Sequence, residues 1–520
     1  MSGLAHSVAP RPLDDRLHTP QNLAHMLSDC VEQVPDREAV ICNETRWSYA
    51  DLGLRVTALA ERIAARVKPN DIVVVIAPNS AGCVAALLAV MASGARVLPV
   101  NPFYPRHELA KLFIERPALI LSVPSTEETA RHLASDLGCD EPWCITDAPA
   151  AEAQDVVARL RTLADRIDSN DAALLIFTGG TTGRSKAVEH CHRALIQSVK
   201  QHATVWALRY DVERILNVAP VFHIWAFGFA MLAPIYLRGT LVLIERYAPE
   251  QVLDAIDRHK VTVFAGGPAP IYYGLLHSPS LPQTRFDTLE LALTGGAACP
   301  QTLKEAWRKA ANCDLLEGWG MSEGAPLCLN WRGDNTPDLS VGRPVPDAEA
   351  QIVDVDDDQR ILEFDEIGEV RVRGPQLMTA YRLESGEPDQ SLRHGWLYTG
   401  DIGRINSDGY VSLVDRKKEI IIVGGYNVYP RDVEDTLRRH PDVMDVAVVA
   451  RKDDYLGETP VAFIVSKTDL NEDSLHSFCQ EHLVKYKRPT RFIRIDELPR
   501  TGPSKINKIA LREMIKGLGE

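Results

Sequence analysis

Short apolar runs, rich in β-branched residues, alternate with longer amphipathic segments from about residue 22 to 335, and this alternation constrains the fold most. Such runs predict buried strands, and the segments between them predict helices. The expected strands are Ile72–Ile76, Arg96–Val100, Ala118–Ser122, Ala172–Phe177, Leu241–Ile244, Val261–Ala265 and Leu289–Leu293, and the expected helices are 50–66, 80–94, 106–115, 189–205, 249–259 and 300–312. A βαβα order predicts an α/β fold of largely parallel sheets with helices on both faces.

After residue 335 the pattern becomes β-rich. Gly368–Gly374 alternates as a strand does, and Ser407–Gly409 is typical of a hairpin turn. The charged run Asp415–Glu419 then precedes a compact α+β region; it is either a solvated turn or a hinge between two domains. A chain of 520 residues is longer than one ordinary domain, which favours the hinge.

Charge and composition exclude several classes of function. The net charge of -14 argues against a nucleic-acid surface, so positive groups that bind an anionic nucleotide must be concentrated locally. Ala81–Ala95 is apolar but too short for the ~20 residues of a membrane span, and predicts a buried helix. The residues before Gln21 do not resemble a signal peptide, and no CxxC pair occurs among ten cysteines. We therefore expect a cytoplasmic protein with reduced thiols.

His190 and His192 flank Cys191 and could in principle bind a metal ion, but polar residues at a helix entrance are the better interpretation.

The segment Thr178–Lys186 carries the clearest chemistry. An apolar strand runs into three glycines, three threonines and a lysine, and a helix is expected to follow. Glycines let backbone N–H groups turn toward an anion, hydroxyls add donors, and the lysine adds charge. The spacing fits neither a Walker A loop nor GxGxxG, so the segment predicts a phosphate-binding loop of another kind.

This loop resembles that of the adenylate-forming superfamily, which includes acyl- and aryl-CoA synthetases, luciferases and peptide-synthetase adenylation domains. The chain looks closest to aryl and acyl-CoA ligases such as the coumarate-CoA ligase group. Further similar segments follow in the family's order: Pro220–Trp225, Thr294–Ala297, Glu317–Glu323, Val341–Pro344, Tyr398–Asp401, Asp415–Lys418 and Pro499–Ile506.

The resemblance implies roles for individual residues. Lys505 would bridge the acid and the α-phosphate of ATP, Glu323 and Thr181 would hold Mg²⁺, and Asp401 would accept from the ribose hydroxyls. Arg416 would reach the ribose or a phosphate, and Lys505, His223, Glu323 and Arg416 form the expected catalytic set. The other expected nucleotide-binding residues are Thr178, Gly179, Gly180, Thr182, Gly183, Lys186, Gly296, Ala297, Gly318, Trp319, Gly320 and Ser322.

Each of these residues also has a plain structural interpretation. Lys505 could be a surface lysine, Glu323 the first acid of a helix, and Asp401 a turn residue. Trp319 could serve packing instead of adenine stacking, and His223 could be a core histidine instead of a gate to the acid pocket and thiol channel.

The chain also departs from the family pattern. Gly179, Ser185 and Ala187 stand where Ser, Pro and Gly are usual. Trp319 replaces Tyr, Ser322 replaces Thr with its hydroxyl kept, and Ser504 replaces the Gly before the catalytic lysine; a position that is often basic is Ile422 or Val423. The charged residues Lys186, Glu323, Asp401, Arg416 and Lys505 are all present. Adenylation is therefore the firmer expectation, and thioester formation the weaker one.

The family's architecture implies a division of labour. Residues 1–414 would form an adenylation domain of stacked, parallel-rich sheets with a β-barrel-like subdomain, 415–418 the hinge, and 419–520 a small mobile α+β lid that carries Lys505. In a second pose Gly424 and Gly425 would line a tunnel for the pantetheine arm of coenzyme A. Arg246 is a candidate for the phosphates of coenzyme A.

The expected acid pocket is snug, apolar and aromatic, and suits a small aryl, arylpropenoic or medium-chain carboxylic acid. Phe222–Trp225 offers no aspartate for an amino group, so an amino-acid substrate is disfavoured. Three alternatives stay open: delivery to a carrier protein or other nucleophile, adenylation of another oxyanion such as nitrite, and a non-catalytic nucleotide binder. The expected lining residues are His223, Trp225, Phe227, Gly320, Met321, Pro326 and Leu327.

Overall fold

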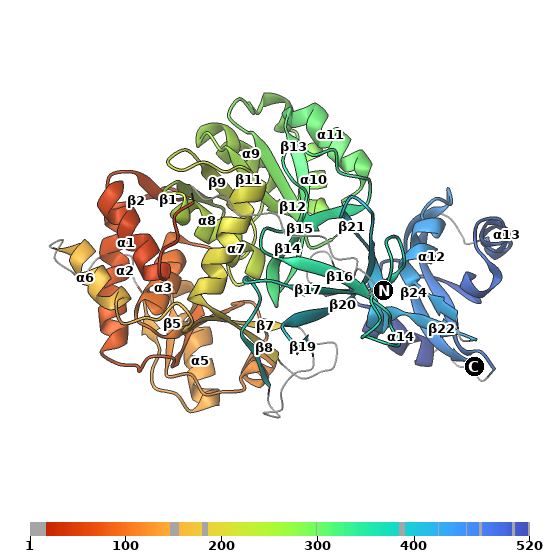
Figure 1. Ribbon diagram of the computed structural model, residues 1–520, viewed down its shortest axis with the longest axis horizontal. Coiled ribbons are helices and arrows are strands. Elements are labelled where there is room, and N and C mark those ends of the chain that lie inside the picture. The colour runs from red at the N-terminus through yellow and green to blue at the C-terminus, as the bar shows by residue number, and fades with distance from the viewer. Residues whose placement is uncertain are drawn as a thin grey trace, which may run out of the picture. The chain divides into compact units, whose positions relative to one another are not determined.

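The computed structural model describes residues 17–145, 155–178, 186–297, 299–383, 391–424, 426–453, 455–466, 471–501 and 505–517. These residues divide into two compact units. The large unit comprises the described residues up to Glu349 together with Val372–Leu397, and the small unit comprises Ala350–Arg371 together with the described residues from Tyr398 onward. Figure 1 labels the elements of both units.

The first sheet of the large unit is parallel through five strands and antiparallel at one edge. The antiparallel strands β8 and β18 extend it beyond β7. Its order is β18 (Ala380–Leu383), β8 (Lys186–Cys191), β7 (Ala172–Thr178), β4 (Arg96–Val100), β3 (Ile72–Ile76), β5 (Leu119–Ser122) and β6 (Trp143–Cys144).

The second sheet of the large unit has a parallel centre with antiparallel strands at both ends. Strands β1, β10, β9, β11, β12 and β13 are parallel neighbours, and β2, β14 and β15 are antiparallel to theirs. The order is β2 (Thr45–Ser48), β1 (Glu38–Cys42), β10 (Thr240–Leu243), β9 (Arg214–Asn217), β11 (Val263–Gly267), β12 (Leu291–Gly295), β13 (Asp314–Met321), β14 (Gly324–Leu329) and β15 (Ser340–Pro344).

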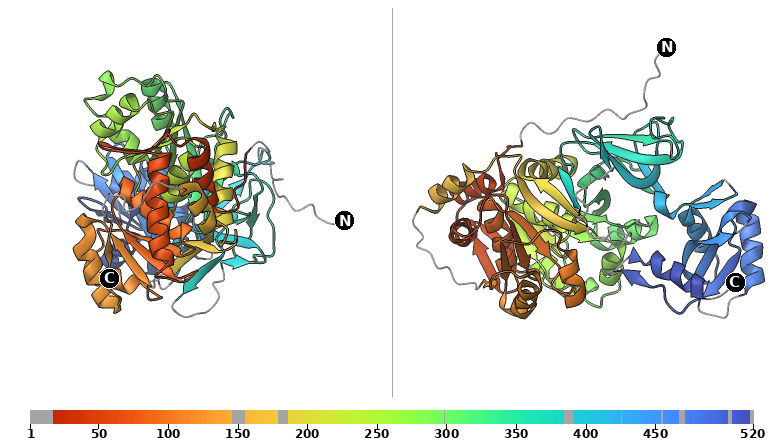
Figure 2. Two further views of the ribbon diagram at one scale, coloured as in Figure 1. Left: turned by 90° about the vertical axis from the view of Figure 1, so that its left-hand side faces the viewer. Right: turned by 90° about the horizontal axis from the view of Figure 1, so that it is seen from below.

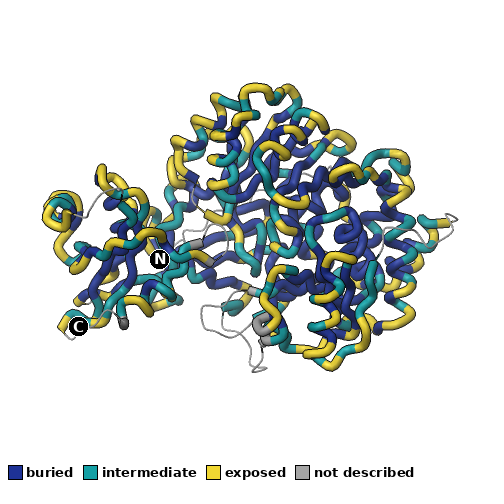
Figure 3. The backbone as a smooth tube through the Cα atoms, turned by 180° about the vertical axis from the view of Figure 1, so that it is seen from behind, coloured by how far each residue is buried: buried dark blue, intermediate teal, exposed yellow. Residues whose placement is uncertain are grey.

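Helices lie between these sheets and on their outer faces, so each central strand is buried on both sides. Val73 and Val75 of β3 face the core between the sheets, and Val74 faces the outer core. Figure 2 shows the helices and sheets of the large unit from two further sides, and Figure 3 shows that most of the backbone in its interior is buried. The inner helices are α1 (Leu23–Gln33), α2 (Tyr49–Ala64), α3 (Ala81–Ala92), α6 (Val156–Ala164), α7 (His192–Val205), the π-helix η3 (Trp225–Met231) and α8 (Leu232–Tyr236), and the outer ones are α4 (Arg106–Leu109), α5 (Glu127–Leu137), α9 (Pro249–Arg258), α10 (Ala269–Leu276) and α11 (Gln301–Ala311). The described part of the unit also has the short 3₁₀ turns η1 (Ala110–Leu112), η2 (Pro124–Thr126) and η4 (Leu281–Gln283).

The small unit holds two β structures. One has the order β16 (Glu349–Val353), β17 (Gly368–Arg373), β20 (Trp396–Ile405) and β21 (Val411–Arg416). The short β19 (Leu392–Arg393) belongs to the large unit, as do its partners Trp396 and Leu397 at the start of β20. The other has the order β23 (Tyr426–Val428), β22 (Ile421–Val423), β25 (Gly457–Ser466) and β24 (Val443–Asp453), with β26 (Arg491–Arg494) beside β25. Helices α12 (Pro430–Leu437) and α13 (Glu472–His482) cover one face and α14 (Lys508–Gly517) the other; η5 (Lys417–Glu419), η6 (Lys485–Lys487) and the pair β27 (Arg500–Thr501) and β28 (Lys505–Ile506) complete it.

Most strands and helices expected from the sequence are found within two residues of their predicted bounds, and the α/β class is confirmed. Two expectations are wrong. The helix expected over 189–205 begins only at His192, because Lys186–Cys191 pairs with β7 and β18 as a strand. The segment 106–115 forms only the short α4 and η1, since the chain is already extended at Phe113.

The buried helix expected over 80–94 is confirmed as α3, all of whose residues are buried. In the described part of the chain, no helix is long and apolar enough to cross a membrane. All ten cysteines are free thiols.

Two histidines of α7 are fully buried. The Nδ1 atom of His192 accepts the Leu23 N–H at 3.3 Å, and His202 lies against the rings of Trp206 and Phe229, with centroids 5.0 and 4.6 Å away. Burial disfavours the charged imidazole, so it lowers the pKa of His192 to about 4 and that of His202 to about 3. Both are neutral above pH 5.

This burial predicts an acid-sensitive fold. Below the ordinary histidine pKa of ~6.5, these two histidines bind protons in the unfolded chain but not in the folded chain. The free energy of unfolding therefore falls as pH drops from ~6.5 toward ~4. The slope should approach about 1.4 kcal/mol per pH unit for each histidine and vanish above ~7.5. His192→Asn, which keeps an acceptor for Leu23, should flatten the fall in urea-unfolding midpoint between pH 7 and 5. His277→Asn, at an exposed histidine, is the control; equal profiles for His192→Asn and wild type would contradict the assignment.

Candidate active site

The predicted acid and nucleotide segments converge at one edge of the second sheet. Strands β10, β9, β11, β12 and β13 are parallel, so their carboxyl ends lie at the same edge, where α/β proteins bind ligands. Pro220–Trp225 follows β9, Gly296 and Ala297 follow β12, and Gly318–Glu323 closes β13. Arg246 follows β10 and is exposed. The topology therefore brings these segments together although about 100 positions separate the first from the last.

A close backbone approach fixes this edge. A Cβ atom on Gly295 would lie 2.7 Å from the carbonyl oxygen of Gly318, so the ends of β12 and β13 can pair only through glycine. Gly296 has φ +78° and is exposed together with Ala297. These residues leave open backbone at the strand ends, as an anionic ligand requires.

The segment predicted to bind the acid runs into a π-helix, and aromatic rings pack against its first residue. Trp225 opens η3 and packs against Phe229, Trp206 and His202, with ring centroids 5.2, 6.2 and 6.1 Å away. π-Helices are rare and are often found at functional sites. His223 is accessible to solvent, yet the protein around it desolvates the imidazole and lowers its pKa, which favours the neutral form.

Other expected pocket residues differ in exposure. Phe227 and Leu327 are fully buried, Pro326 is buried, Met321 is half-buried and Gly320 is exposed. Trp319, expected to face adenine, is buried on β13 opposite Cys328. Their roles as lining or stacking residues stay predictions.

Lys186 and Glu323 meet a residue that sequence reasoning missed. The Tyr381 hydroxyl donates to the Glu323 carboxylate, and its ring lies beside the Lys186 ammonium, with Nζ 5.1 Å from the centroid. Tyr381 reaches both because β18 pairs with β8, which begins at Lys186. Thr178 ends β7 opposite Lys186, whereas Gly179, Gly180, Thr181, Thr182 and Gly183 lie outside the described residues.

His190 was also missed as a site residue. Its Nε2 lies 2.7 Å from the Ser322 carbonyl oxygen, and burial lowers its pKa to about 4, so the neutral ring donates this hydrogen bond. His190 and His192 each hydrogen-bond to backbone, at Ser322 and Leu23, which favours their structural interpretation. In the described ranges no group of three or more acidic, histidine or cysteine side chains is arranged to hold a metal ion.

In the small unit the structure brings together Asp401 and Arg416. They are partners across β20 and β21, and Arg416 Nε lies 2.6 Å from Asp401 Oδ1. Asp401 is buried, and Gly400 before it has φ +67° and donates its N–H to Glu369. A carboxylate has further lone pairs, so Asp401 can accept ribose hydroxyls while it remains paired.

The remaining predicted residues of the small unit are partly described. Gly424 is exposed, has φ +56° and donates its N–H to the Leu456 carbonyl at 2.8 Å, whereas Gly425 lies outside the described residues. The backbone of Lys505 pairs with Thr501, and its side chain lies outside the described part.

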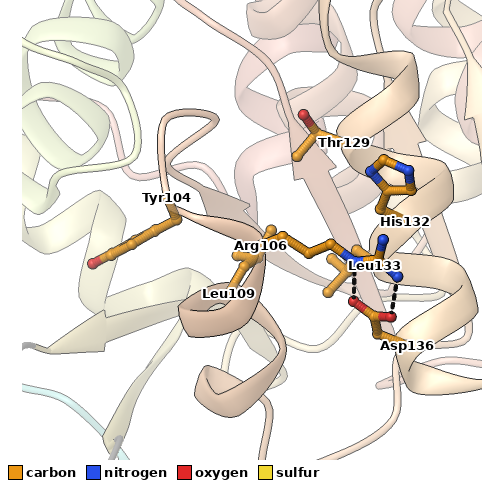
Figure 4. Close-up of a pocket in the computed structure, with 7 residues that line it drawn as sticks. All are labelled: Tyr104, Arg106, Leu109, Thr129, His132, Leu133 and Asp136. Atoms are coloured by element: carbon orange, nitrogen blue, oxygen red, sulfur yellow. Dashed lines mark hydrogen bonds and ion pairs between the residues drawn. The ribbon is translucent and has the colours of Figure 1, made fainter.

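A cavity of about 70 Å³ in the large unit contains none of the predicted site residues (Figure 4). Arg106 crosses it and pairs with Asp136 through two hydrogen bonds of 2.9 and 2.6 Å, so its charged groups are already satisfied.

Family comparison decides the class of this site. Residues 27–382 match the model of the AMP-binding enzyme family, and residues 432–505 match that of the AMP-binding enzyme C-terminal domain. The chain belongs to the AMP-binding enzyme family. The predicted adenylate-forming superfamily is therefore confirmed, and the protein is an adenylate-forming ligase.

The AMP-binding relatives match over nearly their whole length. A long-chain-fatty-acid–CoA ligase of Bacillus subtilis (strain 168) is 31% identical over 548 residues, covering 97% of this chain and 96% of the relative. The 3-[(3aS,4S,7aS)-7a-methyl-1,5-dioxo-octahydro-1H-inden-4-yl]propanoyl:CoA ligase of Mycobacterium tuberculosis is 32% identical and covers 94% of this chain and 98% of the relative. The solved o-succinylbenzoate coenzyme A synthetase of Bacillus subtilis in complex with ATP and magnesium ion is 27% identical, with a TM-score of 0.78 over 94% of this chain and 99% of that chain.

Proposed function

We propose that this enzyme activates a small aryl or medium-chain carboxylic acid with ATP and Mg²⁺, releases pyrophosphate, and transfers the acyl group from acyl-AMP to the thiol of coenzyme A. The observation that carries the proposal is the family match over residues 27–382 and 432–505, combined with acid and nucleotide segments that end at one sheet edge. The names of the relatives, all acid–CoA ligases, support coenzyme A as acceptor.

The chemistry of the first step explains the charged residues. A carboxylate oxygen attacks the α-phosphorus of ATP while the bond to pyrophosphate breaks, so two anions must approach each other. Lys186 would neutralise charge on the leaving phosphates, and Lys505 is assigned the bridge between the acid and the α-phosphate. Asp401 would fix the ribose, and Arg416, paired with it at 2.6 Å, would keep a positive charge nearby.

Glu323 suits the magnesium that accompanies ATP. Glu323 is 8% exposed, and Tyr381 donates to one of its carboxylate oxygens, so the other oxygen could bind a hard cation. Glu323 would hold Mg²⁺, with Thr181 as a second oxygen donor, and the ion would supply charge neutralisation on the phosphates.

The thiol step is assigned to other residues. Gly424 and Gly425 would lie against the narrow pantetheine arm, where a Cβ atom would clash, and exposed Arg246 would pair with the phosphates of coenzyme A. His223, neutral beside the strand end, would gate the acid pocket and the thiol channel. We place the enzyme in the cytoplasm, where its free thiols stay reduced.

The substrate class rests on the aromatic rings around Trp225. Trp225 would make a flat wall of a short pocket, held in place by the buried rings of Trp206 and Phe229, and such a pocket accepts rings better than long chains. The relatives act on a long fatty acid and on a propanoate attached to two fused rings, and the second resembles the proposed class more closely.

Lys505→Ala should abolish formation of acyl-AMP, with a loss on the order of two to four powers of ten in rate, because a charge partner of the transition state is removed. Thioester formation from supplied acyl-AMP should be largely intact. The two half-reactions are measured separately by acid-dependent pyrophosphate release and by acyl-CoA formed from acyl-AMP. Lys516→Ala, in the same tail, is the matched control, and equal damage to both half-reactions would count against the role of Lys505.

Trp225→Ala should open the pocket toward longer or bulkier acids. The measurement is kcat/KM across a series from aryl to long-chain acids, in which each added methylene is worth up to about 1–3 kcal/mol in a hydrophobic pocket. Phe286→Ala, a partly buried ring in another core, controls for general loosening. An unchanged ranking of acids would show that Trp225 does not line the pocket.

Gly425→Leu should leave acid-dependent exchange of pyrophosphate into ATP intact but stop acyl-CoA from appearing, since the side chain would fill the thiol path. The result that would overturn coenzyme A as acceptor is wild-type enzyme that exchanges pyrophosphate with an acid yet forms no acyl-CoA. A carrier protein, another nucleophile or a non-carboxylate oxyanion such as nitrite would then be tested in its place.

A further inference from the structure

Three hydrogen bonds from neighbouring segments hold the turn that carries Glu323. His190 of β8 donates to the Ser322 carbonyl at 2.7 Å, and the Met378 N–H donates to the Glu323 carbonyl at 2.8 Å. The third bond is the only one of these that touches the carboxylate itself: the Tyr381 hydroxyl donates to Oε1 of Glu323. The backbone of the turn is thus fixed by two groups and the orientation of the side chain by a third.

The Tyr381 side chain touches both charged residues of the site in the large unit. Its hydroxyl reaches Glu323, and its ring lies under the ammonium of Lys186 at 5.1 Å, within cation–π distance. Strand pairing explains this, because Tyr381 lies opposite Val188 and two positions from the partner of Lys186. One residue therefore links the end of the phosphate loop to the predicted magnesium ligand.

Glu323 needs such a partner. Glu323 is a buried residue, 8% exposed, and an unsatisfied carboxylate oxygen in that setting is costly. A phenol satisfies one oxygen without bringing in a positive charge that would compete with a cation. A lysine or arginine in the place of Tyr381 would satisfy the oxygen but compete with Mg²⁺ for it.

We propose that Tyr381 is a positioning residue for the magnesium–nucleotide site: its hydroxyl orients Glu323 toward the metal, and its ring supports Lys186 beside the phosphates. The inference rests on the proposed role of Glu323. The Tyr381 side chain would thus have two separate functions: its hydroxyl acts on the metal site through Glu323, and its ring contacts Lys186.

The test uses the full-length enzyme with Mn²⁺ as the metal probe and α,β-methylene-ATP as a nucleotide that cannot donate its adenylyl group. Free Mn²⁺ is followed by electron paramagnetic resonance, and nucleotide binding in EDTA by calorimetry. Tyr381→Phe keeps the ring, so it should weaken Mn²⁺ binding about three- to ten-fold, the scale of the net contribution of one typical hydrogen bond, and leave metal-free nucleotide binding unchanged. Tyr381→Leu should weaken both. Tyr381→His restores a donor and should recover part of the Mn²⁺ affinity.

Tyr49→Phe is a matched control, because it also removes a tyrosine hydroxyl but does so away from the site. The Tyr49 hydroxyl is buried and donates to the carbonyls of Pro234 and Gly239 at 3.1 and 2.8 Å, so Tyr49→Phe costs stability without touching the site. A merely structural role for Tyr381 would make both variants less stable and leave Mn²⁺ affinity unchanged, which would overturn the inference.

Glu323→Gln separates this inference from the proposed function. If Glu323→Gln weakens Mn²⁺ binding and Tyr381→Phe does not, the role of Tyr381 fails while the magnesium site stands. If neither weakens it, the role of Glu323 fails as well.

Discussion

The parallel pairing of β9, β11, β12 and β13 is the constraint on which the large unit depends. Parallel strands end at one edge, so a segment placed after any of them is delivered to the same side of the sheet. At Gly295 the pairing is so close that a Cβ atom would lie 2.7 Å from the carbonyl oxygen of Gly318. Loops that are far apart in the chain can therefore form one site, because the sheet positions them and no loop has to be stable by itself.

Strands buried on both faces are also the reason why much of the fold could be predicted from the sequence. The run Ile72–Ile76 is continuously apolar because both of its faces lie in cores, and its bounds were predicted correctly. Lys186–Cys191 was missed as a strand because its polar residues Glu189 and His190 hide the pattern. Their partners come from elsewhere in the chain: Arg382 and Arg96 pair with Glu189, and Ser322 accepts from His190. A local pattern cannot show compensation of that kind.

The prediction of the site is limited in the same way, because contacts between residues distant in the chain leave no local pattern. Motif order was enough to select Asp401 and Arg416 as candidates, and the structure brings them into an ion pair across two strands. Tyr381 carries no motif signal of its own, and its importance appears only when the register of β18 against β8 is known. Phe227 shows the opposite limit, since position in a motif does not tell whether a side chain faces a ligand or the core.

The π-helix at Trp225–Met231 has an evolutionary consequence. Its wide turn holds one residue more than an α-helical turn would, so it can lose that residue without breaking the chain path. Deletion of a single codon there would convert the turn to α-helix and rotate the preceding side chains by ~100° about the helix axis. The side chains of Trp225 and of the residues before it would then point in new directions, while every strand kept its register. With Trp225 in its proposed place at the acid pocket, a lineage could in this way change the acid that it accepts in a single genetic event.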